Sequence, residues 1–525
     1  MIESPQDEQR QITRRAGIVA LGTLLSRVLG LVREQILAGL FTRAVTDAFM
    51  VAFTIPNMLR QLLAEGAVQS AVLPVLSKTL ETEGPEQARQ YFRRIRALSL
   101  LILVVVSVLG VLLAPWLVDL FAHGSRQHAG QFERTVTLTR WLFPYILFMG
   151  SAALGAAALN THQLFAVTAF APGLLNVSFI VCGLLLPSMF LHLQIDPMMA
   201  LVVGVLMGGL LQVLAQWPAL FRIGYTTRPV LQLRDPRVRE TLRRMGPVLI
   251  GTGVYAIDLV LARRFLSGFD VGAQSYFGFA QRLVDFPQGI FVMALQTATL
   301  PSLAKLASRG DQAALGETFC YGLRLSLFVG LAATALFVCT AEPLVAMIFQ
   351  RGHFDALATQ QTSRALIAQG AGIWAVASIR QLIALYYAIG DTRTPMLVSI
   401  LDLTVFIALA LGLSGSLGHV GVSVAVTGSS ITQAALLLFL LRRHLRLNLS
   451  SQLLPSLTKT CLALVPASLV THWLGGTLLQ AGIGTLLPGL VALTAFGVLF
   501  LVTAKLLRSA ELASLVDPVM RRLLR

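Results

Sequence analysis

Residues 16–41 read AGIVALGTLLSRVLGLVREQILAGLF, an apolar stretch long enough to cross a membrane as a single helix. At 1.5 Å per residue, Arg27 lies roughly 16 Å from the nearer end of this stretch. A guanidinium at that depth costs at least about 2.5 kcal/mol, so it is retained only where it faces water or an anion. Other arginines sit within apolar stretches in the same way: Arg33, Arg60 and Arg282. The pattern predicts a membrane protein with a cationic interior and an anionic occupant.

The composition supports the same class of protein. The mean hydropathy is +0.74 and only 13% of the residues are charged, whereas soluble domains have about 25% charged residues. About fourteen apolar stretches reach the roughly 20 residues that a spanning helix needs. We therefore expect an all-α polytopic membrane protein of about fourteen transmembrane helices. The expected spans are 16–41, 48–77, 97–121, 135–159, 164–191, 197–221, 245–266, 272–304, 325–349, 365–388, 395–414, 418–441, 453–474 and 483–506.

The positive charges alternate between the two sides of the predicted topology. Outside the membrane stretches, 28 lysines and arginines fall on the side of the N-terminus and 8 on the opposite side. This positive-inside bias predicts that both termini are cytoplasmic. The net charge of +16 therefore orients the chain and meets anionic membrane lipids, and it does not indicate a nucleic-acid partner.

An internal repeat divides the chain. LPVLSK at 73–78 recurs as LPSLAK at 300–305, an offset of 227 residues, and Phe92 and Ser99 recur as Phe319 and Ser326. The repeat predicts two six-helix lobes in the same orientation, related by a pseudo-twofold axis. The expected domains are 1–227 (helices 1–6), 228–448 (helices 7–12), and 449–525, which adds helices 13–14 and a basic cytoplasmic tail.

The deep arginines suit a phosphorylated ligand. A guanidinium keeps its charge and offers five donors, which fit a diphosphate better than a neutral or cationic drug. Arg27 and Arg33 are six residues apart, about 240° around an ideal helix, so both face one chamber only if the helix bends, for which Gly30 is suited. The alternative for each is a structural ion pair, and for Arg33 the expected partners are Glu34 or Asp47.

The buried carboxylates form two groups. Glu65 and Asp285 follow Arg60 and Arg282 by five and three residues, which allows pairing or gating contacts. Asp258 and Asp402 have no arginine within one helical turn. With Thr427 or Ser429 they would supply oxygen ligands for a cation, either Na⁺ or H⁺, and the alternative is pairing with Arg263, Arg264 or a neighbouring helix.

Motifs for other chemistry are missing from the sequence. It has no Walker motif, GxSxG, HExxH or metal-spaced His/Cys cluster, so we expect no cofactor and no certain metal site. The four cysteines stand singly in apolar surroundings and are expected to pack in the core. The expected energy source is an ion gradient or the membrane potential.

Several motifs closely resemble the MurJ/MviN family, the lipid II flippases of the multidrug/oligosaccharidyl-lipid/polysaccharide exporter superfamily. They are SRVLGLVREQ (26–35), TDAFMVAFTIPNMLRQLLAEGA (46–67), FPYILF (143–148), FAPGLLN (170–176), AQRLVDFPQGIFVMAL (280–295), LPSL (300–303) and GDTRTP (390–395).

The resemblance implies a transporter, not an enzyme. It would move undecaprenyl-diphosphate-linked peptidoglycan precursor from the inner to the outer leaflet of the bacterial cytoplasmic membrane by alternating access. By motif position, Arg27, Arg33, Arg60 and Arg282 match the family's cavity arginines, and Asp47, Glu65 and Asp285 match acidic positions near them.

Further family features are matched in part. In such proteins helices 13 and 14 form a groove for the polyprenyl tail, and some members have a sodium site on helices 7, 11 and 12, where Asp258 and Asp402 lie here. Thr54 stands where some members carry lysine. The implied partners are lipid II, membrane lipids and cell-wall synthesis proteins.

Other readings remain open from the sequence. A flippase for another polyprenyl-diphosphate-linked glycan would use the same cationic cavity. A multidrug or cation antiporter of the same fold is disfavoured, because these arginines would repel cationic substrates. A membrane glycosyltransferase would need a long outer loop, and no predicted outer loop exceeds roughly 20 residues.

Overall fold

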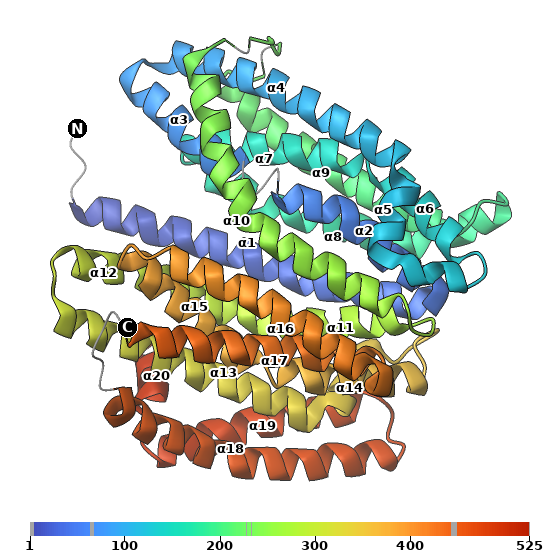
Figure 1. The fold of residues 1–525 in the computed structure, drawn as a ribbon, viewed down its shortest axis with the longest axis vertical. Coiled ribbons are helices and arrows are strands. Elements are labelled where there is room, and N and C mark those ends of the chain that lie inside the picture. Colours follow the sequence, from blue (N-terminus) through green and yellow to red (C-terminus); the bar gives the residue numbers. More distant parts are fainter. Residues whose placement is uncertain (1–4, 63–67, 227, 233, 443–448, 524–525) are drawn as a thin grey trace. The chain divides into compact units, whose positions relative to one another are not determined.

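The computed structural model describes residues 5–62, 68–226, 228–232, 234–442 and 449–523 (Figure 1). Within these ranges all regular structure is helical, which confirms the predicted all-α class. Ten described helices or helix pairs are long and apolar enough to cross a membrane. They coincide with ten of the predicted spans. The chain is a multi-pass membrane protein.

The other four predicted spans contain Arg27, Arg33, Arg60, Asp258 and Arg282. They correspond to α1 (Pro5–Leu40), α2 with α3, α10 (Pro236–Leu266), and α11 with α12. The full number of fourteen therefore stays a prediction.

The first compact unit comprises Met1–Val271. After α1 it contains α2 (Arg43–Arg60), α3 (Gln69–Thr82), α4 (Pro85–Leu112), α5 (Ala114–Ala122), the 3₁₀ turn η2 (His123–Gln127), α6 (Gln131–Leu142), α7 (Tyr145–Thr161), α8 (Phe165–His192), α9 (Met199–Arg222) and α10.

The second unit comprises Gly272–Arg525. It contains α11 (Ala273–Pro287), the π-helical turn η3 (Gln288–Val292), α12 (Met293–Ser308), α13 (Gln312–Phe349), α14 (Ala356–Gly370), α15 (Ile373–Ala388), α16 (Arg393–Leu417), α17 (His419–Leu441), α18 (Leu449–Gln480), α19 (Leu486–Leu506) and α20 (Ala510–Leu523).

Helix boundaries recur at the offset of the sequence repeat. The starts of α4 and the long helix α13, Pro85 and Gln312, are 227 residues apart. The break between α4 and α5 at Leu113 has its counterpart in α13, where Thr340 departs from helical geometry (φ −121°, ψ 19°). π-helical residues begin at Gln61 and at Gln288, again 227 apart. The duplication seen in the sequence therefore extends to local breaks in the helices.

Small residues allow close helix contacts in the first unit. In α1, a Cβ on Gly22 would lie 2.6 Å from the carbonyl oxygen of Ala169 on α8. In α7, a Cβ on Gly155 would lie 2.5 Å from the side-chain oxygen of Gln216 on α9. Glycine at these positions lets the backbones approach, as in membrane helix pairs generally.

Polar contacts hold α10 in the first unit at both of its ends. At its start, Asp235 pairs with Arg94 of α4, Arg237 pairs with Glu83 (3.1 Å), and the Tyr91 hydroxyl hydrogen-bonds Thr241 (2.7 Å). At its end, Arg264 donates to the carbonyl oxygens of Asp119 (3.2 Å) and Leu120 (3.1 Å). By its internal contacts the chain therefore divides into two units after Val271. The predicted boundary at 227/228 lies one helix earlier. It marks the expected duplication and stays a prediction.

The added C-terminal helices are joined to α13. An apolar cluster formed by Phe328, Phe496, Phe500 and neighbours packs α18 and α19 against this helix. At one end of the cluster, buried Glu511 of α20 accepts hydrogen bonds from Arg324 of α13 and Ser456 of α18. The C-terminal segment is thus fixed to the second unit as well as being basic.

Candidate functional site

Arg33 is the predicted site residue with the clearest partners. Its Nη2 donates to Glu34 Oε1 at 2.6 Å, its Nη1 donates to Asn176 Oδ1 at 3.1 Å, and its guanidinium lies 5.7 Å from the ring centre of Phe179. Glu34 is only 3% exposed. The structure thus contains the ion pair that the sequence offered as the alternative for Arg33, and the charge of this guanidinium is balanced locally.

Asn176 links this arginine to the backbone of α1. Its Nδ2 donates to the carbonyl oxygen of Ser26 at 2.9 Å while its Oδ1 accepts from Arg33. The side chain is buried, at 6% exposure, within the mainly apolar helix α8. Because one amide fixes both the helix pair and the guanidinium, Asn176 positions Arg33. Sequence analysis missed this role, although a lone asparagine in an apolar stretch was a usable signal.

Arg27 lies on the same helix as Arg33 and is half-buried. Since α1 runs without a break through Gly30, about 240° of helical rotation separates the two arginines. The bend that would bring both toward one chamber is not marked by any break in the helix. Convergence of Arg27 and Arg33 on one chamber stays a prediction.

Arg60 ends α2 and is half-buried. Its Nε donates to Asn57 Oδ1 at 3.0 Å, and the helix continues into the π-helical residues 61–62. Asp47 lies buried on the same helix, at 5% exposure. Glu65 lies outside the described residues.

Thr54, which stands where some members of the family carry lysine, lies within α2. Thr54 is buried, and its hydroxyl donates to the carbonyl oxygen of Met50 at 2.6 Å, one turn earlier in α2. A lysine at this position would present a charge, whereas the threonine satisfies its donor within the helix.

Arg282 belongs to the second unit, on α11, and its side chain is exposed. Asp285, one turn further, accepts a hydrogen bond from Gln281 Nε2 at 2.8 Å. Directly after Pro287 the helix widens into η3. π-helical turns occur frequently at functional sites, and this one follows the charged part of the family motif.

The three residues of the predicted cation site come from both units. Asp258 lies on α10, Asp402 on α16 and Thr427 on α17. Asp402 lies near Ser429 of α17, and one of its carboxylate oxygens is buried without a hydrogen-bond partner among the described residues. The Thr427 hydroxyl donates to the carbonyl oxygen of Ala368 at 2.7 Å, which leaves its lone pairs available. No cluster of three or more His, Cys, Asp or Glu residues suited to a metal occurs in the described part of the chain.

Comparisons with known proteins agree on one family. Residues 36–492 match the family model described as lipid II flippase MurJ. A lipid II flippase MurJ of Burkholderia cenocepacia is 34% identical over 430 residues, 80% of this chain and 81% of the relative. A probable lipid II flippase MurJ of Vibrio cholerae is 33% identical over 436 residues, 82% of each chain.

Solved structures share the fold. A structure of lipid II flippase MurJ in an inward closed conformation matches with a TM-score of 0.76 and 21% identity, covering 93% of this chain and 98% of that one. An inward-facing MATE multidrug transporter of the MOP superfamily matches with a TM-score of 0.66 and 15% identity, covering 83% and 98%. The sequence relatives and the family model together show that the chain belongs to the lipid II flippase MurJ family.

Proposed function

We propose that this protein flips lipid II, the undecaprenyl-diphosphate-linked peptidoglycan precursor, from the inner to the outer leaflet of the bacterial cytoplasmic membrane. Membership of the MurJ family supports this substrate. The observation that carries the chemistry is the set of arginines within predicted membrane-spanning stretches, because such charges need an anionic or aqueous partner. The protein acts as a transporter by alternating access and performs no chemical reaction on the lipid.

The proposed topology is that of fourteen transmembrane helices with both termini cytoplasmic. Two six-helix lobes related by a pseudo-twofold axis form the core of the transporter, and helices 13 and 14 follow it at the C-terminal end. The repeat of 227 residues in helix boundaries and the positive-inside bias support this arrangement.

The proposed diphosphate ligands are Arg27, Arg33, Arg60 and Arg282, with Asp47, Glu65 and Asp285 as acidic partners that hold or release them. Arg33 is already paired with Glu34 and held by Asn176. Its charge is therefore already balanced in part by Glu34. Its main role is to hold a fixed orientation beside α8.

For coupling, we propose that Asp258, Asp402 and Thr427 bind Na⁺ or H⁺ during part of the cycle. The buried carboxylate oxygen of Asp402 supports a cation-binding role. Direct drive by the membrane potential is the alternative. Besides lipid II and membrane lipids, the expected partners are the cell-wall synthesis proteins that consume lipid II on the outer face.

A flippase for a different polyprenyl-diphosphate-linked glycan would share the same phosphate chemistry. Depletion of the protein in its host separates the two, because the precursor that accumulates on the inner leaflet identifies the substrate. Accumulation of a lipid-linked glycan other than lipid II would overturn the proposed substrate.

Substitution of the arginines tests the phosphate site. Arg27→Ala, Arg60→Ala and Arg282→Ala should each abolish outer-leaflet delivery of lipid II at matched expression, and lysine should restore it only in part because it lacks the guanidinium fork. Arg244→Ala is the control, since Arg244 is exposed and pairs with Glu240 at 2.7 Å. Normal delivery by the three alanine variants would refute the site.

A further inference from the structure

Two glutamines are buried within one membrane-spanning segment of the second unit. Gln369 lies near the end of α14 and Gln381 lies on α15, and these two helices together form the apolar segment Ala356–Ala388. The two side chains are only 4% and 1% exposed. A buried amide in a membrane span is costly unless it is hydrogen-bonded, so what each amide contacts bears on function.

Each amide contacts a different half of the segment formed by α11, η3 and α12. Gln369 Nε2 donates to the carbonyl oxygen of Phe277 on α11 at 3.4 Å and to the hydroxyl of Ser423 on α17 at 3.2 Å. Gln381 Oε1 accepts a hydrogen bond from Thr299 on α12 at 3.0 Å. The π-helical turn η3 lies between the two contacts in the sequence. The segment is thus held on both sides of the turn, which is where a helix bends most readily.

The Gln381 contact replaces an apolar contact of the first unit. Gly322 of α13 makes room for it, because a Cβ there would lie 3.1 Å from Gln381 Oε1 and 3.2 Å from Thr299 Cγ2. At the offset of 227 residues, these three positions correspond to members of one buried apolar cluster in the first unit, namely Val72, Ile95 and Leu154.

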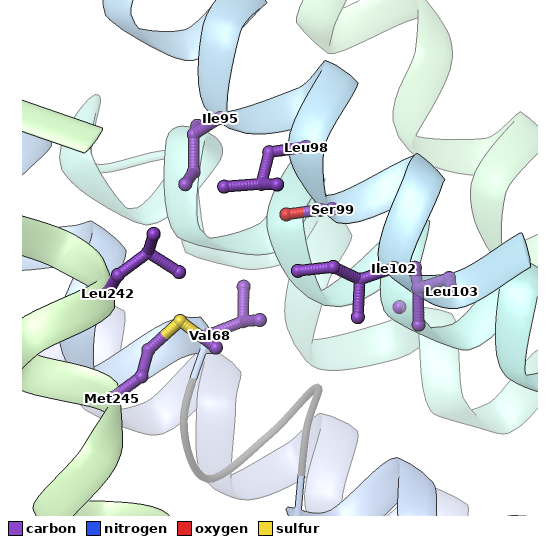
Figure 2. Close-up of a pocket in the computed structure, with 9 residues that line it drawn as sticks. Val68, Ile95, Leu98, Ser99, Ile102, Leu103, Leu242 and Met245 are labelled. Carbon is purple, nitrogen blue, oxygen red and sulfur yellow. The ribbon is translucent and has the colours of Figure 1, made fainter. Parts of the chain in front are cut away.

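The first unit is apolar at both glutamine positions. Figure 2 shows Ile95 lining a mainly apolar pocket together with Leu98 and Ile102 of α4. Gln369 corresponds in the same way to Leu142, which is fully buried. The repeat therefore folds with apolar side chains at these positions. The amides of the second unit point to a role beyond packing.

We propose that Gln369 and Gln381 are positioning residues that hold α11 and α12 so that Arg282 meets the substrate diphosphate. The proposal rests on the diphosphate role proposed above for Arg282. Arg282 follows Phe277 by five residues, less than two helical turns, so the Gln369 contact fixes the rotation of α11 close to the guanidinium. When a contact is lost, the fraction of molecules with Arg282 in place falls, and the affinity for the diphosphate falls with it.

An exchange between the repeats tests the proposal without disrupting the packing. Thr299→Val/Gln381→Leu reproduces Val72 and Leu154 of the first unit, so the double variant should unfold at nearly the same temperature as the unmodified protein. Its dissociation constant for purified lipid II, measured by native mass spectrometry, should rise about threefold to tenfold, the range expected for one hydrogen bond between membrane helices. Gln369→Leu should have a similar effect. Thr299→Ser keeps the donor and should bind lipid II normally.

Gln212→Leu is the matched control, since Gln212 is a buried glutamine of α9 in the first unit, and its binding should be unchanged. In an Arg282→Ala background the glutamine variants should cause no further loss, because they act through Arg282. Fully additive losses, or an equal loss in Gln212→Leu, would overturn the proposal. If Arg282→Ala weakens binding and the glutamine variants do not, only the positioning role fails. If Arg282→Ala itself binds lipid II normally, the diphosphate role of Arg282 fails as well.

Discussion

Glu511 is expected to control the attachment of the C-terminal helix α20 to the second unit. Its carboxylate is 4% exposed and accepts from Arg324 Nε at 2.8 Å and Nη2 at 2.6 Å, from Ser456 Oγ at 2.8 Å and from Ser509 Oγ at 2.9 Å. Glu511→Gln preserves the size of the side chain but removes its charge. The variant should therefore leave Arg324 without its counter-ion.

The magnitude follows from the burial of the pair. Breaking a buried ion pair by removing one partner costs about 3 to 5 kcal/mol. The Arg324 side chain keeps 24% exposure, so water compensates part of that loss, and we expect about 2 kcal/mol. For a unit of this size that corresponds to a fall in Tm of about 4 to 8 °C.

Burial raises the pKa of Glu511, but hydrogen bonds from Ser456, Arg324 and Ser509 outweigh it and hold the pKa below the ordinary value of 4.5. A lowered pKa in the folded state means that the stabilisation is complete above the ordinary value and is lost as the pH falls through the lowered value. Acidification in that range should release α20 in the unmodified protein. It should have less effect on Glu511→Gln.

Thermal unfolding in nanodiscs and amide hydrogen exchange of residues 510–517 measure both effects. Glu317→Gln is the matched control, because Glu317 is an exposed glutamate on the same helix as Arg324. The double variant Glu511→Gln/Arg324→Met should lose less than the sum of the single losses, since each removes the same interaction. Strictly additive losses, or unchanged exchange in α20, would refute the reasoning.

Three further predictions concern packing, topology and coupling. Gly22→Val should lower the Tm, because a Cβ at this position would lie 2.6 Å from the Ala169 carbonyl oxygen. Gly30→Ala should be tolerated, because its Cβ would lie 3.8 Å from Asn176 Nδ2, and thermal unfolding compares the two variants. Single cysteines near residues 85 and 230 should resist impermeant thiol reagents in intact cells, while those near 128 and 270 should react; reversed labelling would invert the topology. Asp258→Asn should slow transport and weaken its ion dependence in vesicles, and unchanged ion dependence would favour direct drive by the potential.

The sequence was sufficient for the class of fold because apolar length depends on local composition. Ten predicted spans coincide with apolar helices in the structure, and the repeat recurs in helix boundaries and in the break at Leu113 and Thr340. The ion pair between Arg33 and Glu34 could also be predicted from the sequence, since the two residues are adjacent. Convergence of the four arginines is not tested by the structure.

Long-range partners were not predictable from spacing. Asn176 meets Arg33 across 143 positions, and Glu511 meets Arg324 across 187. The contacts of Asp235, Thr241 and Arg264 with the rest of the first unit were likewise not visible in the sequence, and the lobe boundary that follows the repeat stays a prediction. Which neighbour a helix packs against depends on side chains at its ends that hydrophobic periodicity does not describe.

The distribution of charged residues among the helices bears on which helices face the substrate. The four predicted spans without an apolar counterpart are α1, α2 with α3, α10, and α11 with α12, and under the offset of 227 the first two correspond to the last two. Arg27, Arg33, Arg60, Asp258 and Arg282 all lie on them. Because charge at depth is costly in lipid, we expect these helices to face the transport path; Asp402, on the apolar helix α16, is the exception. The remaining apolar helices then supply the lipid-facing surface and the packing that holds the charged ones.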